Sequence, residues 1–263
     1  MAAVPSALAP YVTSLVAYDV DLGAPGVHRG LPSTSLTFVL PMGEPLDVGW
    51  ADGRSRGSRW ATVSGLHAGA AAIHHGGHQR GIQLGLTTAG ARSLLGIPAA
   101  ELSGELLDVG EVAPDLAALP ERLHGLGPVA GVPVVLRALS ASLARNGAVE
   151  PRAEVGRALA GLTRGRRVAT VAAEVGYSRR RLTTLVRQET GLAPKEYQRV
   201  ARFESSRALI GHRPLAEVAL ACGYADQAHL ARDWGALAGC TPSTWLREEF
   251  PFLQDPDGAG APA

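Results

Sequence analysis

Hydrophobic positions in the last third of the chain follow a helical period. Between residues 217 and 247, two short segments in succession place apolar side chains on one face and polar side chains on the other. The apolar face of the first segment ends at Cys222, and Gly223 follows where the chain must turn, because glycine readily adopts a positive φ. Leu230 and Trp234 lie four residues apart in the second segment and predict its inward face. The pattern therefore predicts a helix, a tight turn and a second helix.

A second copy of this pattern begins 47 residues earlier, between residues 170 and 197. In both copies, the leucine of the second helix is followed at +4, +9, +12 and +15 by a large apolar residue, a glycine, a proline and an aromatic residue. Agreement at this many fixed offsets indicates an internal repeat of two helix-turn-helix units. The predicted core positions are Val171, Ala172, Gly176, Tyr177 and Leu182 in the first unit, and Val218, Ala219, Gly223, Tyr224, Leu230 and Trp234 in the second.

Polar side chains gather at the start of the second helix in each unit. A short helix that buries one face and exposes polar side chains from its first turns has the form of a DNA recognition helix. Arg179, Arg180 and Arg181 open the first such helix, and their guanidinium groups suit either guanine edges or phosphates. Asp226 precedes the second helix and is expected to cap its N-terminus. His229 suits either a groove contact or a capping or core position.

The string CGYADQAHL, with the downstream Trp, Gly-x-x-Pro and Trp-x-Arg positions, resembles the DNA-binding domain of the AraC/XylS family of bacterial transcription regulators. The resemblance covers residues 151–249 and implies a regulator that binds double-stranded DNA. Trp234 and Trp245 stand where the family usually has Phe and Tyr, and both keep a large aromatic ring. Residues in the positions that the resemblance and the arginine run assign to DNA contact are Arg179, Arg180, Arg181, Thr183, Thr184, Gln227, Ala228, His229 and Arg232.

The first 112 residues have β character. Short apolar or alternating segments at 35–40 and 81–87 predict strands, residues 52–59 read as a loop, and residues 106–109 suit a closing strand. Thr88 is expected to cap a short helix over 89–95, with a helical turn at 99–102. Many short strands with Gly and Pro turns favour a barrel or sandwich, so the fold class predicted for the whole chain is α+β. Residues 81–102 are similar to the poorly characterised N-terminal domain of one AraC-like subgroup, which precedes this DNA-binding domain. The resemblance supplies no ligand, and we expect a domain that acts as a sensor or forms a dimer.

Residues 113–149 return to helical spacing. Leu116, Leu119 and Leu123 predict one helix over 115–126, and a second is expected over 132–143. These helices suit either a contact between two copies of the chain or packing against the β-rich domain. The predicted organisation is thus a β-rich domain over 1–112, a helical linker over 113–149, a DNA-binding domain over 150–250 and a flexible tail over 251–263.

Charge supports the DNA-binding interpretation only where it is concentrated. The formal net charge is +1, but residues 164–213 hold 12 Lys and Arg against 4 Asp and Glu. Such a local excess suits a surface that faces phosphates, although a solvated helix face would look the same. RNA polymerase, a small-molecule effector and a second copy of the chain are further candidate partners. The alternative is a ligand-binding or catalytic β-domain whose helix-turn-helix pair contacts protein.

Other chemistry is weakly supported. His74, His75 and His78 cluster in a glycine-rich stretch where a metal site is conceivable, and a solvated loop is favoured because no Asp, Glu or Cys lies nearby in sequence. Two cysteines make no disulfide framework. Catalytic and nucleotide-binding motifs are missing, so neither an enzyme nor a cofactor is expected. The N-terminus does not read as a signal peptide, and no run is apolar enough to span a membrane, which favours a cytoplasmic protein.

Overall fold

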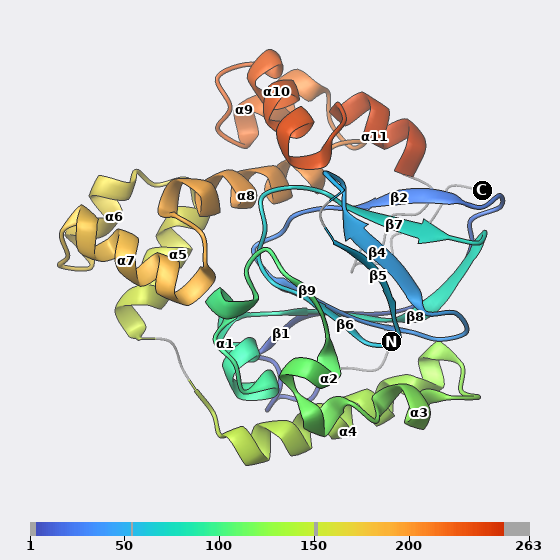
Figure 1. The fold of residues 1–263 in the computed structure, drawn as a ribbon. Coiled ribbons are helices and arrows are strands. Elements are labelled where there is room, and N and C mark those ends of the chain that lie inside the picture. The colour runs from blue at the N-terminus through green and yellow to red at the C-terminus, as the bar shows by residue number, and fades with distance from the viewer. Residues whose placement is uncertain (1–3, 54, 150–151, 250–263) are drawn as a thin grey trace.

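The computed structural model describes residues 4–53, 55–149 and 152–249 (Figure 1). Its first part is built from two antiparallel sheets. The five-stranded sheet has the order β1-β8-β3-β6-β9 and the four-stranded sheet the order β2-β7-β4-β5. The strands are β1 (Val12–Asp21), β2 (Gly26–Gly30), β3 (Leu36–Pro41), β4 (Leu46–Trp50), β5 (Arg56–Arg59), β6 (Thr62–Ser64), β7 (Ala71–His75), β8 (His78–Leu86) and β9 (Leu106–Asp108). The expectation of a β-rich N-terminal region in an α+β fold is confirmed.

The five-stranded sheet separates two hydrophobic layers. Along β3, Phe38 joins the main core on the helical side, while the next residue, Val39, joins a smaller cluster with residues of β4 and β7 from the other sheet. This follows from the two-residue period of a strand, which sends successive side chains to opposite faces. β8 contributes Ile82, Leu84 and Leu86 to the main core. One sheet face is therefore covered by helices and the other by the second sheet (Figure 1).

The sequence-based boundaries in this region need three corrections. β5 lies where a loop was expected and pairs with β4, because its alternating Arg, Gly and Ser side chains give no apolar signal. Thr87, rather than Thr88, caps the following helix by accepting a hydrogen bond from the N–H of Gly90 at 2.9 Å. That helix is α1 (Thr88–Gly90) continued by a π-helical turn, η1 (Ala91–Leu95), which ends at Gly96 with φ of 73°.

The helices after the sheets cover the main core. They are η2 (Ala99–Leu102), α2 (Val109–Val112), η3 (Pro114–Leu116), α3 (Leu119–Leu123) and α4 (Pro128–Asn146). The single helix expected over 115–126 is divided into η3 and α3, yet Leu116, Leu119 and Leu123 are all buried as the pattern predicted. α4 packs against η1 and the β1–β8 pair, so it belongs to the same folded body.

The remaining chain is helical: α5 (Ala153–Thr163), α6 (Val168–Glu174), α7 (Arg179–Thr190), α8 (Pro194–Arg207), α9 (Leu215–Ala221), α10 (Gln227–Ala238) and α11 (Pro242–Glu249). The long α8 joins two groups of helices, one at each of its ends (Figure 1). None of the helices described is long and apolar enough to cross a membrane. The tail expected over 251–263 lies outside the described residues.

Candidate nucleic-acid interface

The first helix-turn-helix unit is formed by α6 and α7. Val171, Ala172 and Leu182 are at most 2% exposed and hold the two helices together. Gly176 turns the chain with φ of 74°. The N–H of Tyr177 then donates to the carbonyl of Ala172 at 2.8 Å, which closes the turn.

The second unit, formed by α9 and α10, repeats this geometry bond for bond. Gly223 has φ of 76°, and the N–H of Tyr224 donates to the carbonyl of Ala219 at 2.9 Å. Leu230 and Trp234 are fully buried. One difference separates the copies, since Tyr224 is buried and Tyr177 only half-buried. The predicted internal repeat thus has a matching backbone hydrogen-bond pattern.

Both recognition helices begin with a side-chain cap. The hydroxyl of Ser178 accepts a hydrogen bond from the N–H of Arg181 at 3.2 Å, and Asp226 accepts one from the N–H of His229 at 2.6 Å. These caps satisfy backbone donors that would otherwise lack partners at a helix start. The structure thus confirms the expected capping role of Asp226. Ser178 does the same work in the first unit, where the sequence reasoning had missed it.

On α7, Arg179, Arg180 and Arg181 are exposed at the first turn. Within the described residues, no carboxylate lies within 4.0 Å of these guanidinium groups, so an external anion can approach them. Thr184 is exposed and Thr183 half-buried. Their hydroxyls donate to the carbonyls of Arg180 and Arg179, at 3.2 and 2.9 Å, which leaves their methyl groups and hydroxyl lone pairs available for outside contacts.

On α10, Gln227, Ala228 and Arg232 are exposed and His229 is half-buried. Nδ1 of His229 accepts from the N–H of Ala225 at 3.2 Å, and its ring meets the Tyr224 ring edge-on at 5.2 Å. Because Nδ1 is the acceptor in this contact, Nε2 carries the proton of the neutral ring. His229 therefore combines a capping contact with a second nitrogen that remains free to donate.

α8 fixes the second recognition helix through a buried carboxylate. Asp233 of α10 accepts from Nε of Arg199 at 2.6 Å and from Arg202 at 3.0 Å. The Arg202 guanidinium also lies 4.4 Å from the centre of the Tyr224 ring. The helical period of residues 194–210 predicts that Arg199 and Arg202 face mostly outward. This prediction is wrong, because both are half-buried and pair with Asp233.

The same helical period predicts an inward face formed by Tyr197, Ala201 and Ala208, and the structure departs from it at the end of α8. Tyr197 and Ala201 are buried as predicted, but Ala208 is exposed. Phe203 and Ser206 fill the buried face instead, and Ser206 accepts a hydrogen bond from Nε1 of Trp234 at 2.9 Å. The helix ends at Arg207, so a helical extrapolation to residue 208 does not hold.

The β-rich region contacts both units. Thr34 donates from its N–H and its hydroxyl to Oε2 of Glu204 on α8, at 3.1 and 2.7 Å, and Arg29 pairs with Glu248 of α11 at 3.0 Å. Arg92 lies 3.6 Å from Glu189 at the end of α7. The main hydrophobic core itself continues from the sheets into α5, α6 and α7. The two parts of the chain are thus tied by both polar and apolar contacts.

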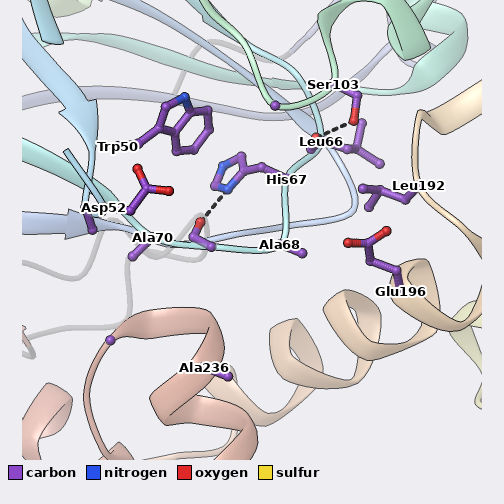
Figure 2. Close-up of a pocket in the computed structure, with 14 residues that line it drawn as sticks. Trp50, Asp52, Leu66, His67, Ala68, Ala70, Ser103, Leu192, Glu196 and Ala236 are labelled. Atoms are coloured by element: carbon purple, nitrogen blue, oxygen red, sulfur yellow. Dashed lines mark hydrogen bonds between the residues drawn. The ribbon is translucent and has the colours of Figure 1, made fainter. Parts of the chain in front are cut away.

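A cavity of about 590 Å³ lies at this junction (Figure 2). Trp50 and His67 line it from the β-rich region, Leu192 and Glu196 from the first unit and the start of α8, and Ala236 from α10. Nδ1 of His67 lies 2.5 Å from the carbonyl of Gly69, and burial lowers the pKa of His67 to about 4. The ring is therefore neutral near pH 7 and packs edge-on against Trp50 at 4.7 Å.

The histidine cluster lies where β7 of the four-stranded sheet ends and β8 of the five-stranded sheet begins, rather than in an open loop. His74 and His75 end β7, and His78 begins β8. His78 pairs with Asp19 at 2.8 Å, while His75 lies beside His28 with ring centres 5.6 Å apart. In the described part of the chain, no group of three or more His, Cys, Asp or Glu side chains is placed to hold a metal ion. Cys222 and Cys240 do not form a disulfide.

Comparison with known proteins identifies the C-terminal part. The family described as helix-turn-helix domain matches residues 156–248. No curated protein sequence matches the chain. The fold is similar to that of ToxT from Vibrio cholerae, with 12% identity over 90% of this chain and 99% of that chain and a TM-score of 0.57. It is also similar to unsaturated fatty acid-bound wild-type ToxT from Vibrio cholerae strain SCE256, with 11% identity over 92% and 98% of the two chains and a TM-score of 0.53. Residues 156–248 therefore belong to the AraC-type helix-turn-helix family, and the chain carries the DNA-binding domain of a transcription regulator.

Proposed function

We propose that the protein is a sequence-specific regulator that binds two successive major-groove segments of double-stranded DNA, one through α7 and one through α10. The observation that carries this proposal is the pair of capped recognition helices with exposed arginines, three at the start of α7 and Arg232 on α10, which form no ion pair with the described residues. A shared geometry in both units suits two segments one helical turn apart, about 34 Å along the duplex. Since the DNA lies in the cytoplasm of a bacterium, we place the protein there.

The proposed roles of the contact residues follow from their chemistry. Arg180 and Arg232 read base edges, because a guanidinium group can bond both acceptors of a guanine. Arg179 and Arg181 neutralise phosphates at the start of α7. Gln227 and Nε2 of His229 offer hydrogen bonds in the second groove segment. Ala228 and the two threonines, Thr183 and Thr184, supply mainly small apolar contacts.

A binding assay on labelled duplexes tests these roles. The duplex is taken from a footprint on the region upstream of the protein's own coding sequence, with a scrambled duplex as competitor. Arg180→Ala and Arg232→Ala should each weaken binding to the selected duplex by about 1–3 kcal/mol and reduce discrimination against the competitor. Arg157→Ala on α5 is the matched control, since Arg157 is equally exposed but lies outside both recognition helices. Equal affinity for wild type and both variants would refute the assigned contacts.

Salt dependence separates this proposal from one in which the helix pair contacts protein. Each phosphate neutralised should add about −0.9 to the slope of log K against log salt concentration. A steep negative slope supports DNA contact by the arginines. If DNA is not retained at low salt, the helix pair acts on a protein partner instead.

We also propose that residues 1–112 form a sensor domain, residues 113–149 a linker and residues 150–250 the DNA-binding domain. The fragment 150–250 should bind the selected duplex when expressed alone, because it contains both units and the α8 bridge. Its first unit should be less stable than in the full chain, since α5, α6 and α7 share a core with the β-rich region. Gel shift and circular dichroism of the fragment check both points, and a folded fragment that binds no DNA would contradict the division.

We further propose that the protein responds to a small-molecule effector. A cavity of about 460 Å³ lies between the sheets and the DNA-binding region, and its lining includes His28, Arg207 and Trp245. ToxT, which has a similar fold, has been solved with an unsaturated fatty acid bound. We infer that a ligand of this size acts on DNA affinity through Glu204 and Arg207 of α8, both of which line the cavity. Titration of the protein–DNA complex with oleate tests the inference, and unchanged DNA affinity would exclude this ligand class.

RNA polymerase and a second copy of the chain remain proposed partners. α4 packs on η1 and the β1–β8 pair, in agreement with the alternative that these helices pack against the β-rich domain. Val129 at the start of α4 is nevertheless 76% exposed. Sedimentation of Val129→Glu against wild type tests whether this position lies in a contact between copies. An unchanged sedimentation coefficient would remove Val129 from any such contact.

A further inference from the structure

A third cavity is lined only by residues that precede the DNA-binding region. It has a volume of about 700 Å³ and is bounded by the end of β3 and the turn after it, the residue after β5, one residue of β8, and α3 with the connection that follows it. Its volume falls in the usual range for small-molecule sites, about 300–1,000 Å³. It shares no lining residue with the cavity next to α8. The lining residues are Pro41, Met42, Gly43, Trp60, Arg80, Pro120, Glu121, Leu123, His124, Gly125 and Leu126.

Most of this lining is apolar. Met42 and Leu123 are buried, at 5% and 3% exposure, and supply an inner surface. Trp60 is 45% exposed, which makes it the one exposed tryptophan of the four in the chain, since Trp50, Trp234 and Trp245 are 6% exposed or less. This indole ring is partly exposed to water beside an apolar cavity. A ligand that covers the ring removes apolar surface from water, which is favourable. The lining therefore favours an apolar ligand.

Arg80 gives the cavity a specific charge. Its Nε donates to the carbonyl of Met42 at 2.7 Å, which fixes the guanidinium group at the cavity. Gly43 leaves room for it, because a Cβ at that position would lie 3.2 Å from Nε of Arg80. Among the residues described, no carboxylate lies within 4.0 Å of this guanidinium, and Glu121, the one acidic lining residue, is exposed. The fixed cation has room for an anionic partner.

We propose that this cavity binds a small apolar organic anion, with its ring or chain against Trp60 and its carboxylate or sulfonate on Arg80. Arginine suits this role because its planar donors can bond both oxygens of a carboxylate. The cavity walls come from the β-rich region and from α3, which belongs to the segment that precedes the DNA-binding region. Binding here does not depend on whether the helix-turn-helix units contact DNA.

The probe is 8-anilinonaphthalene-1-sulfonate, an apolar aromatic anion whose emission rises on burial. Because Trp60 lines the cavity and the other three tryptophans do not, energy transfer to the bound probe should be strongest from Trp60, and Trp60→Phe should lower it more than loss of any other tryptophan. Arg80→Met should weaken probe binding by tenfold or more, whereas Arg80→Lys, which keeps the charge but loses the planar pair of donors, should weaken it less than Arg80→Met. Arg122→Met is the matched control, since Arg122 is an exposed arginine on α3 that does not line the cavity.

Competition with two unbranched ligands tests the charge preference in the same full-length protein. Octanoate should displace the probe, and octylamine, with the same chain and the opposite charge, should not. Circular dichroism of each variant distinguishes loss of the site from loss of the fold. Probe affinity that is equal in wild type, Arg80→Met and Trp60→Phe, or displacement by octylamine as readily as by octanoate, would overturn the proposal.

Discussion

Glu204 of α8 accepts two hydrogen bonds from one residue of the β-rich region, Thr34. The N–H of Thr34 lies 3.1 Å and its hydroxyl 2.7 Å from the same carboxylate oxygen. α8 joins the two helix-turn-helix units, so this contact holds the bridge between them rather than either recognition helix. The β-rich region is therefore bonded directly to the helix that connects the two units.

Removal of this contact should weaken the attachment of α8 to the sheets. Thr34→Val keeps the shape and loses the hydroxyl, and Glu204→Gln loses the charge; each should cost about 1–2 kcal/mol of unfolding free energy. A double-mutant cycle in urea should give a coupling energy of about 1 kcal/mol. Ser205→Ala, on the same helix but bonded only to Ala201, is the control. Additive effects of the two substitutions would show that the side chains act independently.

The two units should respond differently to the same substitution after their recognition helices. Gly191 and Gly239 occupy equivalent positions with φ of 79° and 72°, so alanine costs about 1–2 kcal/mol at either. A Cβ on Gly191 would also lie 2.1 Å from the Cβ of Ser103, whereas nothing lies within 4 Å of one on Gly239. Gly191→Ala should therefore be more destabilising by about 1–3 kcal/mol, measured by urea unfolding. Equal losses would mean that the first unit does not pack on η2 in solution.

Asp233 should be needed for the stability of the second unit. Asp233→Asn removes the charge that Arg199 and Arg202 share, and leaves two half-buried guanidinium groups without a carboxylate. We expect a loss of about 1–3 kcal/mol in thermal or urea unfolding. Asp226→Asn is the control, because asparagine caps a helix about as well as aspartate. Comparable effects of the two substitutions would contradict the role assigned to Asp233.

Stability should fall as the pH is lowered from about 6.5 towards 4. Burial lowers the folded-state pKa of His67 to about 4, and burial together with His75 lowers that of His28 to about 4. Between these values and about 6.5 the unfolded chain binds more protons than the folded chain, so each histidine can contribute up to about 3 kcal/mol that is present above pH 6.5 and lost below it. His67→Gln should flatten the profile measured by urea unfolding. His212→Gln, on the exposed surface, is the control, and equal slopes in both variants would exclude His67 as a source.

The sequence by itself determined the helix-turn-helix repeat and the position of its recognition helices. Val171 and Val218, or Leu182 and Leu230, report local helical periodicity, and the turn glycines report a backbone geometry that other residues rarely adopt. Such signals depend only on neighbours within a few residues. For the same reason the cap at Asp226 could be predicted from its place before the helix.

Tertiary structure alone decided the features that depend on partners distant in sequence. β5 has no apolar pattern and forms because it pairs with β4. Arg199 turns inward because it pairs with Asp233, which lies 34 residues later in the sequence on another helix. The cavity next to Trp60 is likewise assembled from four separate segments. The energies of strand pairs and ion pairs depend on contacts between segments that are distant in sequence. Local periodicity does not indicate which segments will be in contact.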